Sequence, residues 1–347
     1  RSVGLGWMAR RSRHRSMKKA LKGKAWWQPK VSMEPLEPRY LLSADLLPIH
    51  MDPDGGDLSL SLNLHTDINS DEWIQVVDNG GSLIDQRLLQ ETSGIEITGS
   101  AFDDRLSLEM DSFIPFSLPQ GILFNAGQGA DMLELLGGQF SQFDSVSHGL
   151  EGAGQGHVGF GANGNSLGLD FSGVEDLSDK IDAAARLFSN DTGEAQSLRL
   201  TDDGTVGDGV SVLESTGVDA LTTISFDSPT ESLTIQAGDA GDTITVGDFD
   251  AAATLDVQGG AGDDTFVIEA TAPVTGSVSG GAGDDALVGS DGDNIWSING
   301  LDAGDLNGLG FSEVENLVGG AGADTFAFQT GGSISGSIDG GAGNNTF

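Results

Sequence analysis

The sequence predicts an all-β chain: a parallel β-solenoid of the β-roll or β-helix type, preceded by a short, irregular, basic N-terminal segment. Three observations predict this fold class. A Gly-rich turn recurs along the last third of the chain, short segments alternate apolar with polar residues, and the chain holds 53 Gly against 1 Tyr. Alternation of period two is typical of half-buried strands, and a turn repeated at regular spacing is typical of stacked coils.

The composition indicates that this chain needs more than an apolar core in order to fold. Gly accounts for 53 of the 347 residues, and the apolar residues other than Gly make up 37%. Gly loses more backbone entropy on folding than any other residue, so stacked repeats or bound ions have to compensate. Cys is absent, which excludes disulfides, thiolate zinc sites and thiol nucleophiles.

The charge of the chain is acidic and unevenly placed. The formal net charge is −37, yet residues 1–33 hold ten Lys and Arg and no acid. Residues 200–347 hold 25 Asp and Glu and no Lys or Arg. Like charges crowded in one region repel one another unless solvent or metal ions neutralise them. The sign of this charge also excludes nucleic acid as a partner of the acidic region.

Composition divides the chain into a basic segment, a degenerate solenoid region and a strictly repetitive region, which are residues 1–50, 51–235 and 236–347. In the middle region, the alternating segments Leu58–Leu64 and Ile95–Thr98 predict strands. Lys180–Leu187 is the one stretch that predicts a helical turn or two. The last repeat stops at Phe347, so we expect the sequence to be truncated at its C-terminus.

Five copies of one pattern carry the repeat. They are named here by their first residues and read GGAGDDTF (turn 259), GGAGDDAL (turn 280), GSDGDNIW (turn 289), GGAGADTF (turn 319) and GGAGNNTF (turn 340). Coils of roughly 18–21 residues would stack turn 259 on turn 280. The same spacing would stack turn 319 on turn 340 along that edge, with turn 289 on the opposite edge. A second echo links Phe171–Leu177 (FSGVEDL) with Phe311–Leu317 (FSEVENL).

Each turn combines residues that can hold a hard cation. Gly permits tight turns whose carbonyl groups point at one centre, and the Asp at the sixth position adds a carboxylate. Calcium prefers six to eight such oxygens, and no single turn offers enough of them. The expected metal-binding residues are Gly259, Gly260, Gly262, Asp264, Gly280, Gly281, Gly283, Asp285, Asp291, Asp293, Gly319, Gly320, Gly322 and Asp324. The large residues at the eighth position should begin short strands and point into the core: Phe266, Leu287, Trp296 and Phe326.

This pattern resembles the RTX (repeats-in-toxin) nonapeptide GGxGxDxUx, in which U is a large apolar residue. Gly280–Val288 and Gly289–Ser297 form a tandem pair at nine-residue spacing, and looser relatives occur at Gly127–Leu133 and Ala237–Ile244. The resemblance implies a calcium-binding β-solenoid in which stacked turns share each ion. The copies depart from it in places: Ser290 replaces the second Gly of turn 289, and Asn344 and Asn345 replace the acidic pair of turn 340. The alternative is that the turns are Gly- and Asp-rich β-turns without metal.

A second resemblance lies near the N-terminus. Leu36–Leu42 (LEPRYLL) is similar to the LEPR-XLL motif at every fixed position. In that family the motif marks very large, repetitive bacterial proteins that are exported or surface-bound. The resemblance implies an adhesin-like protein, secreted or at the cell surface of a Gram-negative bacterium. It leaves open a polysaccharide or a protein of the cell surface or matrix as a partner. No apolar run approaches the ~20 residues of a membrane span.

No motif in the sequence predicts catalysis. Gly164–Gly168 (GNSLG) fits the GxSxG string, but that string needs a strand, a sharp turn and a helix, which the surrounding Gly-rich sequence does not predict. The five His are scattered and no HExxH string occurs. We therefore expect no enzyme activity in this chain. Two alternatives stay open: the accessory solenoid of an exported polysaccharide lyase or protease whose catalytic domain lies elsewhere, and an acidic disordered tether.

Overall fold

A computed structural model describes residues 45–52, 54, 56–78, 80–110, 118–138, 142–216, 221–250 and 253–347. Leu42–Phe347 form one compact unit. Within the described ranges, the secondary structure consists of strands and one short 3-10 helix, η1 (Leu89–Glu91). Residues 1–44, which include Leu36–Leu42 and most of the basic segment, lie outside the described residues, whereas the last six residues of that segment, Asp45–His50, form a strand. The sequence-based boundary at residue 236 falls inside a strand, Ser232–Gly238.

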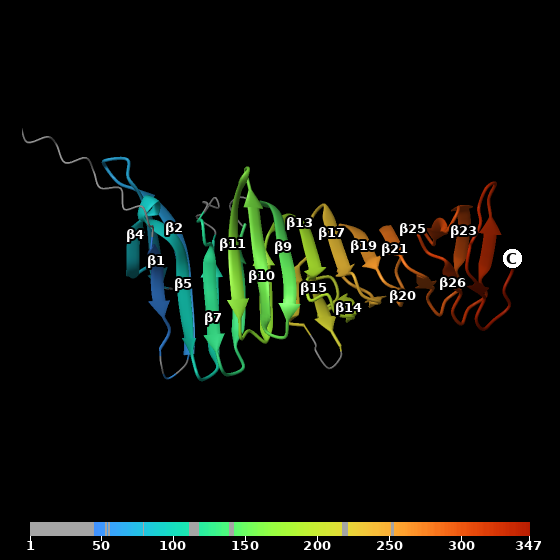
Figure 1. The fold of residues 1–347 in the computed structure, drawn as a ribbon, viewed down its shortest axis with the longest axis horizontal. Helices are drawn as coiled ribbons and strands as arrows, with labels where there is room; N and C mark the ends of the chain where they lie inside the picture. Colours follow the sequence, from blue (N-terminus) through green and yellow to red (C-terminus); the bar gives the residue numbers. More distant parts are fainter. Residues whose placement is uncertain are drawn as a thin grey trace, which may run out of the picture. The chain divides into compact units, whose positions relative to one another are not determined.

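The strands form two sheets of fourteen strands each. The first sheet consists, in chain order, of β1 (Asp45–His50), β5 (Thr92–Ser100), β7 (Ile122–Gly127), β9 (Phe143–Gly152), β10 (Gln155–Ala162), β11 (Asn165–Ser172), β13 (Ala183–Asn190), β17 (Ser232–Gly238), β19 (Thr254–Ala261), β21 (Gly276–Ala282), β23 (Ile295–Gly300), β24 (Ala303–Leu306), β25 (Leu309–Ser312) and β27 (Thr325–Phe328). Figure 1 shows how these strands follow one another along the unit.

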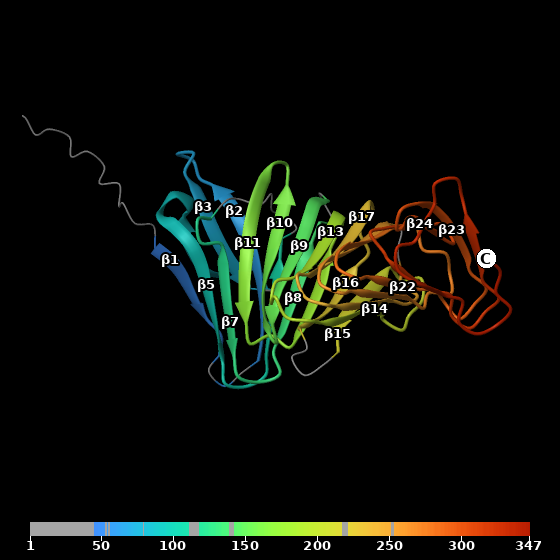
Figure 2. The ribbon, with the colours of Figure 1, turned by 45° about the vertical axis from the view of Figure 1, so that its right-hand side comes forward.

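The second sheet consists of β2 (Gly56–Thr66), β3 (Glu72–Asp78), β4 (Leu83–Leu88), β6 (Asp104–Glu109), β8 (Met132–Gly137), β12 (Asp176–Ile181), β14 (Ser197–Asp202), β15 (Val210–Ser215), β16 (Thr223–Asp227), β18 (Thr243–Val246), β20 (Thr265–Ile268), β22 (Ala286–Val288), β26 (Asn316–Val318) and β28 (Ile338–Asp339). Figure 2 brings several of these strands into view. Most of the chain alternates between the sheets, and one strand of the first sheet followed by one of the second is called a rung below.

Consecutive rungs pair in parallel. For example, β19 pairs with β17 on one side and β21 on the other, and β20 pairs with β18 and β22. The predicted all-β class with long, mostly parallel sheets is therefore confirmed. The predicted strands at Leu58–Leu64 and Ile95–Thr98 are confirmed as parts of β2 and β5.

Antiparallel insertions interrupt this regular winding. In three places inside the sheets a single strand is replaced by a three-stranded meander: β9–β11 and β23–β25 in the first sheet, and β14–β16 in the second. Each of these three runs ahead, turns back, and returns next to the preceding rung, as β25 does beside β21. A fourth meander, β2–β4, forms one end of the second sheet. The echoed segments Phe171–Leu177 and Phe311–Leu317 both begin in the returning strand and lead into the second sheet.

The core lies between the two sheets and is filled by alternate side chains of each strand. β17, for example, buries every second residue. The four eighth-position residues are buried as predicted, with Leu287 and Trp296 0% exposed and Phe266 and Phe326 1% exposed. Trp296 and Phe326 stack with ring centroids 5.4 Å apart. Burying such a side chain contributes about 1.5–3 kcal/mol, repeated in each rung.

The helical turn predicted at Lys180–Leu187 is wrong, because these residues belong to β12 and β13. β13 pairs in parallel with β9 and β17, and those hydrogen bonds outweigh the helix preference of its Ala residues. The same strand buries a charge. Arg186 binds Asp179, which accepts a second hydrogen bond from His148 at 2.8 Å, and all three side chains are inaccessible to solvent.

Candidate metal-binding turns

The turns that connect the two sheets lie along two edges. The first edge holds turns that lead from the first sheet to the second, and the second edge holds turns that lead back. Turn 259 joins β19 to β20 and turn 280 joins β21 to β22, so both lie on the first edge. Turn 289 joins β22 to β23 and lies on the second edge. The predicted stacking of turn 259 on turn 280, opposite turn 289, is confirmed.

The predicted edge of turns 319 and 340 is wrong. Both turns follow strands of the second sheet, β26 and β28, so they stack on each other and on turn 289 along the second edge. The meander β23–β25 is the reason. It keeps the chain in the first sheet for two additional strands, so the residues between turn 280 and turn 319 make up one and a half rungs rather than two.

The sixth-position aspartates of the first edge form a buried ladder. The backbone N–H of Asp242 donates to Oδ1 of Asp264 at 2.7 Å, and that of Asp264 donates to Oδ1 of Asp285 at 2.8 Å. The ladder continues at both ends, to the backbone N–H of Gln196 and to the carboxylate of Glu315. The three aspartates are at most 1% exposed. One oxygen of each carboxylate is thus fixed by the neighbouring rung.

The other oxygen of each aspartate has no donor. Oδ2 of Asp242, Asp264 and Asp285 is buried and accepts no hydrogen bond from any described residue. A Cβ added at Gly259 would overlap both Oδ2 of Asp264 and the carbonyl oxygen of Gly280 in the next rung. These two acceptors therefore lie close to the same point. Buried acceptors that face each other without a proton between them cost free energy.

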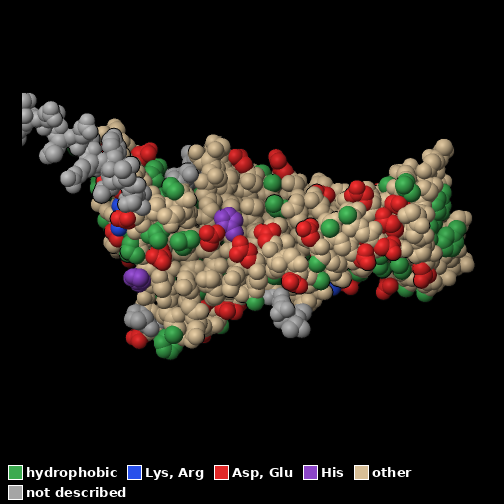
Figure 3. All heavy atoms as spheres, in the orientation of Figure 1, with side chains coloured by type: hydrophobic (Ala, Val, Ile, Leu, Met, Phe, Trp, Pro, Cys, Tyr) green, Lys and Arg blue, Asp and Glu red, His purple; other side chains and the backbone are tan. Residues whose placement is uncertain are grey.

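The pKa values of the ladder carboxyl groups also indicate that their negative charge is unfavourable in the folded chain. Burial raises the pKa of the Asp264 carboxyl group to about 6, partly offset by the hydrogen bond from the N–H of Asp242 and reinforced by the charge of Asp285. Burial likewise raises the pKa of Asp242 and of Asp285. Figure 3 shows many Asp and Glu side chains across the visible face and few Lys or Arg. A proton or a cation would relieve this row of charges.

The fifth-position aspartates face solvent and accept hydrogen bonds from the neighbouring rung at the surface. Oδ1 of Asp263 accepts the N–H of Asp284 at 3.0 Å, and Oδ1 of Asp293 accepts the N–H of Ala323 at 2.8 Å. Both carboxylates are exposed. In turns 259 and 280, the two adjacent aspartates therefore belong to two separate ladders, one exposed and one buried.

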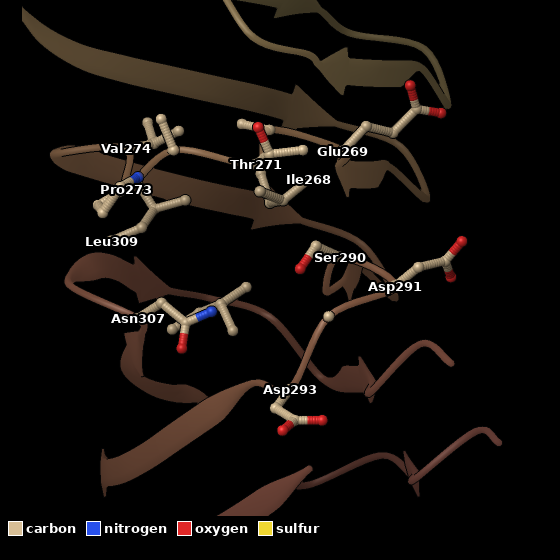
Figure 4. A pocket seen from close by; sticks show the side chains of 14 residues that line it. Ile268, Glu269, Thr271, Pro273, Val274, Ser290, Asp291, Asp293, Asn307 and Leu309 are labelled. Carbon is tan, nitrogen blue, oxygen red and sulfur yellow. The ribbon is translucent and has the colours of Figure 1, made fainter. Parts of the chain in front are cut away.

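Two expected metal ligands, Asp291 and Asp293, do not occupy the buried position of their turn. Both are exposed, and the sixth position of turn 289 is Asn294, which is 1% exposed. Figure 4 shows that the two carboxylates do not point toward one another. They border a surface pocket of about 400 Å³ that Thr271 and Pro273 line on its other side. They are not part of the buried ladder.

The second edge has a ladder of its own. The N–H of Asn294 donates to Oδ1 of Asp324 at 2.8 Å, and the N–H of Asp324 donates to Oδ1 of Asn345 at 2.9 Å. Oδ2 of Asp324 is buried, and no residue in the described ranges donates a hydrogen bond to it. A Cβ at Gly319 would overlap that oxygen and lie 2.5 Å from the carbonyl oxygen of Gly340. Turn 319 therefore repeats the geometry of turn 259.

Sequence reasoning missed two further aspartates with the same geometry. Asp242 sits at the sixth position of the looser copy Ala237–Ile244, and Asp131 ends the looser copy's turn at residues 127–131. Asp131 is 1% exposed, its Oδ1 accepts the N–H of Asp104 at 2.8 Å, and its Oδ2 has no donor. The Asp at the sixth position is the sequence feature that could have identified both residues. The looser copies lack the Gly-Gly pair that begins most of the other turns, and the feature was overlooked for that reason.

Any cation at these turns must take most of its ligands from the backbone. No group of three or more His, Cys, Asp or Glu side chains that could hold a metal occurs in the described ranges. The donor set at each turn is one carboxylate per rung plus carbonyl oxygens, which suits a hard, oxygen-seeking cation such as calcium. The residues of turns 259, 280 and 319 fit that requirement, because each has a buried oxygen that lacks a partner.

The GNSLG string lies in a hairpin. Ser166 belongs to β11 and pairs with Gly161 of β10, and the turn between them has positive φ at Asn163 and Gly164. Two such residues in succession form the tight turn that is typical of β-hairpins. The strand–turn–helix geometry of a nucleophile elbow is therefore not formed at this string.

No family model, curated protein or solved structure matches this chain. The resemblances to RTX repeats and to the LEPR-XLL motif therefore rest on the quoted residues alone. Among the described residues, no helix has the length and apolar character needed to cross a membrane.

Proposed function

We propose that this chain is the calcium-binding, structural or adhesive repeat region of a large secreted or surface protein. It folds as a parallel β-solenoid whose stacked Gly/Asp turns share calcium ions. One observation carries the proposal. A row of buried carboxylate oxygens along the first edge receives no hydrogen bond from any described residue and lies beside carbonyl oxygens of the next rung.

The residues that would hold the cations follow from that geometry. On the first edge they are Asp242, Asp264 and Asp285, together with carbonyl oxygens of turns 259 and 280; on the second edge, Asp324 is the corresponding carboxylate. A bound calcium ion supplies the positive charge that the acidic region lacks. Each carboxylate keeps one oxygen on the backbone of the preceding rung, which holds the other oxygen in place.

This arrangement couples metal binding to folding. The unfolded chain has no such site, so the free energy of calcium binding adds to the free energy of folding. Extracellular calcium modules bind with dissociation constants on the order of 10⁻⁴–10⁻³ M. A site of that affinity stays empty at cytosolic calcium concentrations and fills outside the cell. This difference suits a protein that is exported as a flexible chain and folds after export.

Calorimetric titration of the 347-residue chain with calcium tests the proposal. Replacing Asp264 and Asp285 together by Ala should lower the number of bound calcium ions by at least one. The matched control replaces the exposed neighbours Asp263 and Asp284 by Ala, which removes the same charge but no buried oxygen. The control should bind as the wild type does. An unchanged stoichiometry in the Asp264/Asp285 variant would rule out the proposed site.

A further inference from the structure

Asn294 occupies the sixth position of turn 289, where other turns have a buried Asp. Its side-chain amide nitrogen, Nδ2, meets four oxygens: the carbonyls of Ser290 at 2.8 Å, Gly292 at 3.0 Å and Gly319 at 2.7 Å, and Oδ1 of Asp324 at 2.9 Å. Three backbone carbonyls and one carboxylate thus converge on a single atom. Two of these four oxygens belong to the next rung.

The orientation of this amide is fixed by its other atom. Oδ1 of Asn294 accepts hydrogen bonds from the Ser290 hydroxyl at 3.1 Å and from Nδ2 of Asn307 at 2.9 Å. Donors therefore surround the amide oxygen and acceptors surround the amide nitrogen. Exchanging the two atoms would place oxygen against oxygen on one side of the group and N–H against N–H on the other.

The aspartate turns have the same frame with an oxygen in place of that nitrogen. The N–H of Asp264 donates to Asp285 Oδ1 at 2.8 Å, and the N–H of Asn294 donates to Asp324 Oδ1 at the same distance. The Gly280 carbonyl lies beside Asp264 as the Gly319 carbonyl lies beside Asn294. The difference is that Asp264 Oδ2 has no hydrogen to give to these acceptors.

We infer that Asn at the sixth position takes over the role of the cation, so that the choice between Asp and Asn decides which turns need calcium. The two amide hydrogens are shared among the four converging oxygens and bring no charge, so turn 289 closes in the absence of metal. Asn345 acts likewise in turn 340, where its Nδ2 donates to the carbonyls of Gly340 at 2.7 Å and Ala342 at 3.1 Å.

This inference rests on the proposed function for the identity of the ion. It also implies that the two edges of the molecule differ in how much they depend on calcium. The first edge stacks three carboxylates, Asp242, Asp264 and Asp285, each with an oxygen that lacks a donor. Among the described residues of the second edge, Asp324 is such a carboxylate and lies between two amides, and Asp202 at the end of β14 is another. Calcium therefore acts mainly along the first edge, and on the second edge the turns that carry Asn294 and Asn345 close through hydrogen bonds of their own.

Two opposite substitutions in the 347-residue chain test the inference by hydrogen exchange in metal-free buffer. Asp264→Asn should slow exchange in residues 259–268 by about 10- to 100-fold, because the new amide satisfies acceptors that were unpaired. Asn294→Asp should speed exchange in residues 289–298 by a similar factor, and added calcium should reverse that effect. Asp263→Asn is the matched control, since it removes the same charge from an exposed neighbour that keeps its hydrogen bond through Oδ1.

The outcomes separate this inference from the proposed function. If Asp264→Asn and Asp263→Asn exchange alike in metal-free buffer, or if Asn294→Asp stays fully protected there, the inference is overturned, even where the wild type binds calcium. If calorimetry detects no calcium binding to the wild type and Asp264→Asn still slows exchange, the proposed function fails and the role of the amide stands. The Asp264→Asn result does not depend on whether Asn294→Asp folds.

Discussion

Lowering the pH should stabilise the metal-free chain at its first edge. Burial raises the pKa of Asp264 from 3.8 to about 6, and it raises the pKa of Asp242 and Asp285 in the same direction. A carboxyl group whose pKa is higher in the folded chain binds more protons when folded. The free energy of unfolding therefore falls as the pH rises from about 4 to about 6, and it recovers as the pH is lowered again.

The magnitude follows from the shift of Asp264. Moving the pKa from 3.8 to about 6 costs about 3 kcal/mol at pH 7, at 1.36 kcal/mol per pKa unit. Roughly half of that cost is recovered between pH 7 and pH 5, and screening by water near the turn lowers the expected gain to about 0.5–1.5 kcal/mol. Calcium competes with protons for the same oxygens, so its stabilising effect should be largest at pH 7 and smallest at pH 5.

Urea unfolding of wild type and Asp264→Asn at pH 5, 6 and 7 in metal-free buffer measures this effect. The comparison is needed because His148 also makes the unfolding free energy depend on pH. Burial lowers the pKa of His148, which destabilises the folded chain as the pH falls and opposes the carboxylates. That contribution is common to both chains and cancels. The reasoning is refuted if the difference in unfolding free energy between the two chains does not change with pH, or changes in favour of the wild type as the pH rises.

Two further substitutions test the packing of the turns and of the core. Gly259→Ala should lower the free energy of unfolding by about 1–3 kcal/mol, because its Cβ overlaps Asp264 Oδ2, and calorimetry should detect one calcium ion fewer. Gly292→Ala is the control: its Cβ meets only a hydroxyl at 3.5 Å, so it should change stability little. Equal effects of the two would contradict the account. Arg186→Ala should cost about 3–5 kcal/mol in urea unfolding, because it leaves the buried Asp179 carboxylate without its main partner; a loss below about 1 kcal/mol would contradict this.

Features that depend on local sequence pattern could be predicted. The period-two segments become strands, the eighth-position residues become core, and turn 259 stacks on turn 280. Each of these follows from alternation or spacing within one rung. The meander β23–β25 could not be predicted in this way, because the choice between a parallel and an antiparallel neighbour depends on strands that are distant in the sequence. The edge assigned to turn 319 failed for that reason.

The candidate site was predicted in type but not in full. The Gly and Asp residues of turns 259 and 280 come together as expected. Asp242 was missed because its copy lacks the paired glycines, and Asn294 was missed because the acidic residues Asp291 and Asp293 precede it. Only stacking shows that this one position is buried and hydrogen-bonded to the next rung. The adjacent carboxylates of Asp291 and Asp293 carry the same charge and remain in solvent.

The central claim is that calcium completes the stacked aspartate turns and thereby orders the chain. Far-UV circular dichroism of the 347-residue chain, recorded in chelator and then in millimolar calcium, tests it most directly. The account predicts a gain of β-structure with calcium and no comparable gain when sodium chloride is added to the same ionic strength, because screening supplies no ligand geometry. The same β-rich spectrum in chelator and in calcium would contradict the account.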